Sequence, residues 1–223
     1  MKICVPITAT TIKQALADAN QAVELGAELL ELRIDYLQDL SPAGFAQLFK
    51  ACLTPVIVTP RSKEEGGHWE LGEPARRDYL LEALELGVDY IDYELARDLA
   101  LRIEILARRR QTKVILSYHN FAGCPPLAEL ILIKNEMLNE GADLAKIAVM
   151  ANTLDDNEIV YQLLQDARSK KQSLIALAMG ELGAPTRIKG PQLGSFLTYA
   201  SLPGKPSAPG QITIGKIQNS TLR

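Results

Sequence analysis

Short apolar runs rich in β-branched residues alternate with longer amphipathic stretches along the whole chain, and no other sequence feature constrains the fold as strongly. The short runs have the length of β-strands, and the stretches between them are long enough for helices. Glycine, which commonly ends a helix before the next strand, directly follows three of these stretches, as Gly26, Gly87 and Gly141. Eight strands are expected: Lys2–Ile7, Leu29–Arg33, Val56–Arg61, Tyr90–Glu94, Lys113–His119, Leu144–Met150, Ser173–Met179 and Ser195–Tyr199.

Eight such units in 223 residues predict a single α/β domain over residues 1–223, a (β/α)8 TIM barrel with parallel strands. The alternative, an open doubly wound sheet, usually carries a glycine-rich turn after its first strand, and Thr8–Thr11 contains no glycine. The segment Pro185–Pro209 is rich in proline and glycine, so the seventh and eighth units should be shortened, with a seventh helix near Arg187–Leu193. Longer helices are expected at Thr11–Leu25, Pro74–Leu86, Leu95–Arg110, Pro126–Asn139 and Leu154–Arg168.

Composition excludes several classes of function. The formal net charge is -3 and the basic residues are dispersed, so nucleic-acid binding is not expected. No apolar run approaches the ~20 residues of a membrane helix, and the chain leads from Met1 into an apolar strand without a cleavable signal pattern. The three cysteines are scattered and form no Cys-x-x-Cys or Cys/His cluster, so no metal site is expected. These features predict a cytoplasmic protein with reduced thiols.

Charged residues occupy strand positions that should face the barrel interior. Alternate strand residues point to the lumen, and the positions facing the helices should be apolar, as Leu30 and Leu32 are. A barrel interior is normally packed with apolar side chains, and burying an isolated ion costs several kcal/mol. The charges should therefore either compensate one another in a structural network or line a wet pocket at the carboxyl ends of the strands. The lumenal set is Glu31, Arg33, Thr59, Arg61, Asp92, Glu94, Ser117, His119 and Lys146.

Two members of this set could carry chemistry. Lys146 is the one lysine that lies inside an apolar strand, where burial disfavours the charged amine and leaves more of the free form to attack a ketone. His119 ends its strand, where a barrel enzyme places a general acid or base. The structural alternatives are a core lysine paired with Glu31 or Glu94, and a histidine bonded to backbone. The second histidine, His68, lies in a polar loop and is expected at the surface or in a lid.

Six segments in chain order resemble the type I 3-dehydroquinate dehydratase family of the shikimate pathway. Each segment alone is short, but together they cover nearly the whole chain, and each falls at a suitable strand end. They are Glu31–Asp35, Arg61–Gly67, Ser117–Phe121, Lys146–Met150, Met179–Gly180 with Thr186–Arg187, and Ser207–Gln211.

The resemblance implies dehydration of 3-dehydroquinate to 3-dehydroshikimate through a Schiff base on Lys146, with His119 as the general acid and base. Glu64 is expected to orient His119, and Arg187 to bind the substrate carboxylate. The lysine imine supplies the electron sink, so no metal or organic cofactor is expected, and the family commonly forms homodimers. Glu31, Arg33 and Arg61 are expected to bind the ring hydroxyls of the substrate. Ser207 and Gln211 are expected to close over the substrate from a mobile loop.

Two alternatives stay open. A class I aldolase would also carry a lysine on its sixth strand, although Glu181 between Gly180 and Gly183 disfavours the phosphate site common in such enzymes. A barrel kept as a binding protein would be expected to lack one of the proposed catalytic residues. The chain departs from the resemblance in its shortness, in Thr186 where serine is expected, and in Asn120 where aspartate is common.

Overall fold

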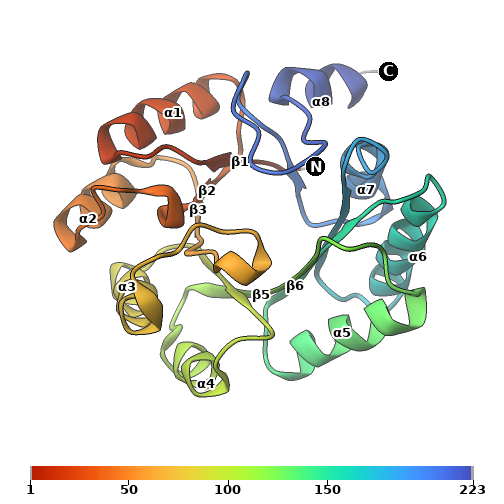
Figure 1. The fold of residues 1–223 in the computed structure, drawn as a ribbon, viewed down its shortest axis with the longest axis horizontal. Helices are drawn as coiled ribbons and strands as arrows, with labels where there is room; N and C mark the ends of the chain where they lie inside the picture. The colour runs from red at the N-terminus through yellow and green to blue at the C-terminus, as the bar shows by residue number, and fades with distance from the viewer. Residues whose placement is uncertain (1, 222–223) are drawn as a thin grey trace.

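A computed structural model describes residues 2–221, which form eight parallel strands ringed by eight α-helices (Figure 1). The strands are β1 (Ile3–Ile7), β2 (Leu29–Leu32), β3 (Val56–Val58), β4 (Tyr90–Glu94), β5 (Lys113–Asn120), β6 (Leu144–Met150), β7 (Leu174–Met179) and β8 (Thr198–Tyr199). The helices are α1 (Ile12–Glu24), α2 (Pro42–Ala51), α3 (Gly72–Leu86), α4 (Leu99–Arg108), α5 (Leu127–Asn139), α6 (Asp156–Ser169), α7 (Pro185–Leu193) and α8 (Ile214–Thr221). The predicted TIM barrel is confirmed.

The strands pair in chain order from β1 to β7, and β8 pairs with β1. Cys4 lies opposite Leu29 on one side and Tyr199 on the other. Between β7 and the segment before β8, the Phe196 N–H donates to the Leu174 carbonyl at 2.8 Å. The barrel is therefore nearly closed, with its weakest pairing where the short eighth strand meets its neighbours.

The barrel has two apolar clusters, one between the strands and the helices and one inside the lumen. The layer between strands and helices contains Leu30, Leu32 and Ile147, which is the outward set expected from sequence. The lower part of the lumen holds a second apolar cluster that includes Leu29 and Ile115. The charged residues lie beyond Leu29 and Ile115 toward the carboxyl ends of the strands, so these two side chains belong to the floor of any site built there.

The element boundaries differ from the sequence predictions mainly at the ends of strands and in two helices. The third strand ends at Val58, and the eighth begins only at Thr198. Helix α2 was not predicted; it begins with a Ser41 side chain that accepts from the Gly44 N–H and with proline in its first turn. Helix α8 was also not predicted, whereas the shortened α7 and β8 confirm the reduced final units.

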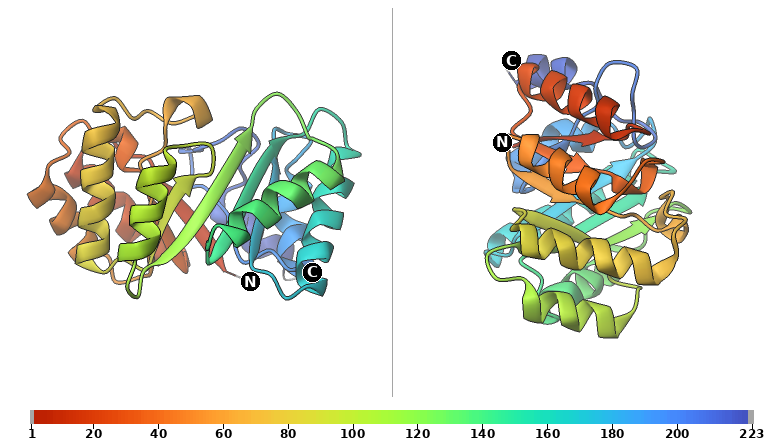
Figure 2. Two further views of the ribbon diagram at one scale, coloured as in Figure 1. Left: turned by 90° about the horizontal axis from the view of Figure 1, so that it is seen from below. Right: turned by 90° about the vertical axis from the view of Figure 1, so that its left-hand side faces the viewer.

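The long connections gather at one end of the barrel. Figure 2 shows β5 running from the end where the chain termini lie to the opposite end, where the loops that follow β3 and β5 project. Short 3-10 turns follow β2 at Ile34–Tyr36 and β3 at Lys63–Glu65. Within residues 2–221, no helix combines the length and apolar character needed to cross a membrane.

Candidate active site

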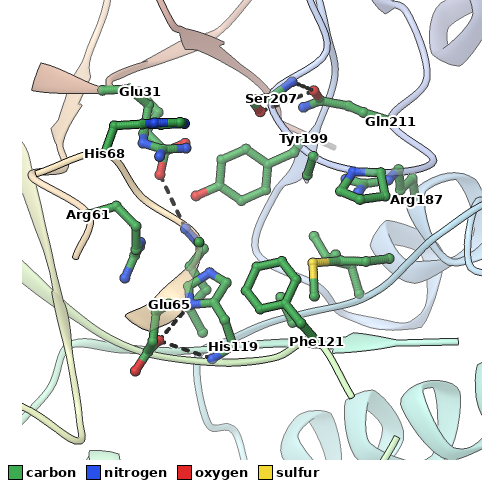
Figure 3. Close-up of a pocket in the computed structure, with 18 of the residues that line it drawn as sticks. Glu31, Arg61, Glu65, His68, His119, Phe121, Arg187, Tyr199, Ser207 and Gln211 are labelled. Carbon is green, nitrogen blue, oxygen red and sulfur yellow. Dashed lines mark hydrogen bonds and ion pairs between the residues drawn. The ribbon is translucent and has the colours of Figure 1, made fainter. Parts of the chain in front are cut away.

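A cavity of about 280 Å³ opens at the carboxyl ends of the strands (Figure 3). It lies above the apolar floor of the lumen, in the position where barrel enzymes place their active sites. Strands β2, β5, β6, β7 and β8 contribute side chains to it, and so do α7 and the loops after β2, β3, β5 and β8. The predicted site residues that line it are Glu31, Arg33, Arg61, His119, Lys146, Arg187, Ser207 and Gln211.

Lys146 projects from the middle of β6 into the bottom of this cavity. Its Nζ lies 2.7 Å from the Asp92 carboxylate and 3.2 Å from that of Glu31. The lysine side chain is 6% exposed, so its remaining access is through the cavity alone. The paired partners are thus Asp92 and Glu31, and not Glu94 as one alternative from sequence held. Two carboxylates therefore hold the amine at the bottom of the cavity.

Asp92 also connects the lysine to a buried arginine. One Arg61 guanidinium nitrogen lies 2.7 Å from Asp92 and another 3.3 Å from Glu94, and Arg61 donates to the Ser117 hydroxyl at 2.7 Å. Burial alone would raise the pKa of Asp92, but the cations of Arg61 and Lys146 hold that pKa well below its usual range. The lumenal charges therefore compensate one another, and the network leaves Asp92 ionised.

His119 stands at the end of β5 with its imidazole held by Glu65. The Glu65 carboxylate accepts from His119 Nδ1 at 2.8 Å and from the His119 backbone N–H at 3.1 Å (Figure 3). Because an ionised carboxylate can only accept, this bond fixes the tautomer with the proton on Nδ1. Nε2 is then the free acceptor, and an acceptor beside the Lys146 cavity can serve as a base.

The prediction that Glu64 orients His119 is wrong. The Glu64 side chain is 71% exposed and pairs with Arg97 outside the cavity. The 3-10 turn after β3 presents successive residues in different directions, so the neighbouring Glu65 faces inward. A Cβ atom on Gly67 would lie 2.0 Å from the Arg61 carbonyl oxygen, so only glycine lets the loop fold back closely enough to bring Glu65 to His119.

Burial and neighbouring charges shift the pKa values of this pair in opposite directions. Burial, followed by the charges of Arg61 and Lys146, lowers the pKa of His119 well below its usual value. Burial also raises the pKa of Glu65 to about 7. The imidazole is therefore neutral in the free protein and ready to accept a proton, and Glu65 is the group of the pair that titrates near neutrality.

Arg187 enters the cavity from α7 without an anionic partner. It is 2% exposed, and its Nε and Nη2 atoms have no hydrogen-bond partner among residues 2–221. Burial lowers its pKa to about 10, so the guanidinium still carries its charge at neutral pH. A buried, unpaired and charged guanidinium is unfavourable unless a ligand supplies the anion, and a carboxylate matches its geometry.

The loop after β8 forms the wall beside Arg187. Ser207 and Gln211 line the cavity and bond to each other, with the Ser207 N–H donating to Gln211 Oε1 at 2.6 Å. The Gly180 N–H donates to the Pro209 carbonyl at 3.1 Å, which holds the loop against the end of β7. Gly210 has φ +68°, and a Cβ there would lie 1.9 Å from the Gly180 carbonyl oxygen, so this approach requires glycine.

Arg33 and His68 also belong to the cavity lining. Arg33 lines the cavity and forms a two-point ion pair with Asp35, at 2.9 and 2.7 Å. His68 also lines it, with its ring 4.3 Å from that of Tyr36, as expected for a lid residue. Asp35 accepts from the His68 backbone N–H at 3.0 Å, so the two loops that carry these residues are tied together.

Glu65 and Tyr199 are among the lining residues that were given no role from sequence. Glu65 stands beside the residue that was chosen, and only the backbone turn distinguishes them. Tyr199 belongs to an expected strand, and its alternation with Thr198 could have placed it in the lumen. Within the described part of the chain, no group of three or more His, Cys, Asp or Glu side chains could hold a metal ion.

Known proteins match the chain over nearly all of its length. The family model described as type I 3-dehydroquinase matches residues 3–221. The 3-dehydroquinate dehydratase of Methanothermobacter thermautotrophicus is 40% identical over 215 residues, 96% of this chain and 92% of that protein. The 3-dehydroquinate dehydratase of Methanococcus vannielii is 37% identical over 220 residues, 97% of this chain and 96% of that protein.

Solved structures agree with the sequence comparisons. The 3-dehydroquinate dehydratase of Geobacillus kaustophilus has a TM-score of 0.91 and 30% identity, covering 98% of this chain and 89% of that one. The type I enzyme of Clostridium difficile, solved with covalently modified comenic acid, has a TM-score of 0.91 and 26% identity, covering 99% and 91%. A family model that spans almost every residue, together with relatives of this identity, leads to one conclusion: the chain belongs to the type I 3-dehydroquinase family.

Proposed function

We propose that this chain dehydrates 3-dehydroquinate to 3-dehydroshikimate and water through a Schiff base on Lys146. The activity is that of a hydro-lyase of the shikimate pathway, which leads to chorismate and the aromatic amino acids. One observation carries the mechanism: Lys146, the neutral base His119 and the unpaired Arg187 line one cavity. A nucleophile, a proton carrier and an anion site within one pocket are what this reaction requires.

Binding begins with the substrate carboxylate. The buried Arg187 guanidinium, which has no anionic partner in the protein, binds the substrate carboxylate. It donates two parallel N–H···O bonds, and these fix the plane of the carboxylate. Glu31, Arg33 and Arg61 then meet the ring hydroxyls from the opposite side of the cavity, while Ser207 and Gln211 cover the ring from the loop after β8. Held in this way, the ring ketone lies over the Lys146 amine.

Covalent catalysis starts when Lys146 passes a proton to the free Nε2 of His119 and its nitrogen attacks the ketone carbon; His119 later returns this proton to the oxygen that leaves as water. The C–N bond forms as the C=O π electrons move to oxygen, and the carbinolamine then loses water to give a protonated imine. This cation withdraws electrons from the adjacent carbon, so the neighbouring C–H becomes acidic. Asp92, held ionised by Arg61, stays beside the nitrogen and stabilises the positive charge that develops on it.

His119 carries out the proton transfers that follow. Its free Nε2 removes the proton from the activated carbon, and the electron pair forms an enamine. The imidazolium is stabilised by Glu65 at 2.8 Å, and it then donates the proton to the leaving tertiary hydroxyl. The enamine electrons expel water and leave a conjugated iminium, whose hydrolysis returns the Lys146 amine and releases 3-dehydroshikimate. Because one histidine serves first as base and then as acid, the proton and the tertiary hydroxyl must leave from the same face of the ring.

Borohydride trapping tests this proposal. The protein is incubated with 3-dehydroquinate and sodium borohydride, its intact mass is measured, and the modified peptide is mapped. We expect one reduced adduct per chain on Lys146 and none in Lys146→Ala, which should also lose nearly all turnover. Lys216→Ala removes an exposed lysine on α8 and is the matched control. A Lys146→Ala variant that is trapped to the wild-type extent contradicts the assignment.

We also propose a cytoplasmic homodimer that does not bind nucleic acid. The net charge of -3 and the dispersed basic residues support the absence of nucleic-acid binding. The dimer and the location rest on the family resemblance. Light scattering of the purified chain tests the dimer, because a single mass near that of one chain would contradict it.

A further inference from the structure

Tyr199 brings a polar atom to the cavity that nothing in the protein satisfies. It lies on β8, is 4% exposed and belongs to the lumenal cluster. Its hydroxyl has no hydrogen-bond partner within residues 2–221. Figure 3 shows the hydroxyl pointing into the pocket, and no dashed line reaches it. A buried hydroxyl without a hydrogen bond lowers the stability of the protein. Its presence here therefore indicates that a bound ligand supplies the hydrogen-bond partner.

The position of the ring relates this hydroxyl to the reacting amine. Lys146 Nζ lies over the Tyr199 ring, 4.7 Å from its centroid. Arg61 Nη2 and two Arg187 nitrogens are the other buried polar atoms of lining residues without a hydrogen-bond partner among residues 2–221. Arg61 Nη2 lies 2.7 Å from Asp92, whereas the Arg187 nitrogens have no carboxylate beside them. The two residues thus form one wall whose polar groups await a ligand. A ligand that binds Arg187 and reacts at Lys146 occupies the cavity that Tyr199 also lines.

The hydroxyl is suited to donate and not to accept a proton. Burial, followed by the carboxylate of Glu31, raises the pKa of Tyr199 well above its ordinary range. The phenol therefore keeps its proton at every working pH. Its oxygen is closed to solvent in the ligand-free structure, so a partner reaches it only when a neighbouring group moves. The Lys146 amine lies 4.7 Å from the centroid of the same ring, and attack on a substrate moves this amine.

We infer that Tyr199 is a further catalytic residue, whose hydroxyl donates a hydrogen bond to the ketone oxygen as Lys146 attacks. This inference rests on the proposed Schiff-base mechanism. As the C–N bond forms, the C=O π electrons move to the oxygen, and the hydrogen bond stabilises the negative charge that develops there. Tyr199 keeps its proton throughout; the proton that makes the oxygen leave as water comes from His119. The aromatic ring meanwhile keeps water from the amine.

Two weaker roles make different predictions. A ring that only fills the floor of the cavity does not need its hydroxyl, so loss of the oxygen would leave every rate unchanged. A hydroxyl that binds a ring hydroxyl of the substrate equally in the ground and transition states would affect KM and leave the rate of adduct formation at saturation unchanged. Only donation to the reacting oxygen slows the covalent step itself.

The experiment is rapid-quench trapping with borohydride of wild type and Tyr199→Phe at saturating 3-dehydroquinate, with Tyr161→Phe as control. Tyr161 is a buried tyrosine on α6 that is not among the residues lining the cavity. We expect adduct formation in Tyr199→Phe to be about tenfold slower, equivalent to about 1.4 kcal/mol. We also expect its Tm without substrate to rise by about 2–4 °C, because an unsatisfied hydroxyl has been removed. The control should keep the wild-type rate.

The outcomes separate this inference from the proposal beneath it. A wild-type rate of adduct formation in Tyr199→Phe overturns the inference, and a raised KM with that same rate assigns the hydroxyl to ground-state binding instead. In both cases the wild-type adduct on Lys146 leaves the Schiff base standing. Absence of any adduct in the wild-type protein overturns both.

Discussion

The two sides of the cavity differ in whether their charged groups already have partners. On the side built by β2 to β6, Lys146 contacts two carboxylates and His119 is held by Glu65. On the side built by α7 and β8, two Arg187 nitrogens and the Tyr199 hydroxyl are buried without partners among residues 2–221. The first side we call the paired wall and the second the open wall. Both belong to one barrel and face one ligand.

The difference shows how a barrel can hold so much charge and still fold. The paired wall compensates its charges internally, so it needs no ligand to be stable, and its groups exchange protons among themselves during the reaction. The open wall lowers the stability of the free protein, because it buries polar groups without partners, and it regains that free energy when the substrate binds. Substitutions should therefore act on the two walls with opposite signs in stability.

His119→Ala tests the paired wall and should have a larger effect on turnover than any substitution in the open wall. Loss of the proton carrier should lower kcat by about 10²–10⁴-fold, while some imine still forms. Because Glu65 loses a hydrogen bond worth about 1 kcal/mol, Tm should fall by about 2–4 °C. Steady-state absorbance of the enone measures kcat, and a thermal melt measures Tm. Wild-type turnover would remove His119 from the mechanism, and an unchanged Tm would mean that the bond to Glu65 contributes little.

Arg187→Met tests the open wall, where stability should move the other way. Methionine fills a similar volume without the unpaired charge, so Tm should rise by a few degrees. Loss of the carboxylate clamp should raise KM by about 10²-fold, since each charged hydrogen bond contributes about 1.5–3 kcal/mol. A lower Tm would mean that the Arg187 guanidinium already has hydrogen-bond partners in the free protein. The open wall would then not differ from the paired wall in this respect.

Sequence periodicity predicted the barrel because each strand needs one apolar face against the helices. Leu30 and Leu32 on β2, and Ala145 and Ile147 on β6, fulfilled that need and fixed which alternate residues turn inward. Helix α2 escaped prediction because its apolar stretch is short, and its start depends on the local Ser41 cap. The reach of β3 was overestimated because the last backbone contact with a neighbouring strand is made at Thr59, whose N–H donates to the Leu32 carbonyl at 3.0 Å, and the strand registers themselves end at Val58.

The candidate site was predictable where it depends on strand alternation and less so where it depends on a turn. Lys146 and Arg61 follow from their strands, and their meeting in one cavity agrees with the prediction. Glu64 and Glu65 are chemically identical neighbours, and the choice between them is made by a 3-10 turn and by the close approach at Gly67. Neither feature is visible in hydrophobic periodicity, which explains the wrong prediction.

Glu65 and its neighbour Glu64 supply the prediction with the smallest expected effect, with Glu64 as the matched control for Glu65. Burial raises the pKa of Glu65 to about 7, whereas His119 stays neutral because its own pKa is well below the usual value. As pH falls below about 7, Glu65 takes up a proton and loses the negative charge that orients Nδ1–H and stabilises the imidazolium. The free-enzyme quantity kcat/KM of the wild type should therefore decrease below about pH 7.

Glu65→Gln should remove this acidic limb, because the amide oxygen still accepts from Nδ1 but cannot titrate, and kcat should fall only about tenfold. Glu64→Gln should keep the wild-type profile and rate within about twofold, since that side chain is exposed and pairs with Arg97. The measurement is kcat/KM from pH 5 to 9 for all three proteins. An unchanged acidic limb in Glu65→Gln would assign the titration to another group of the paired wall, and a limb lost in Glu64→Gln would restore the residue that sequence alone had favoured.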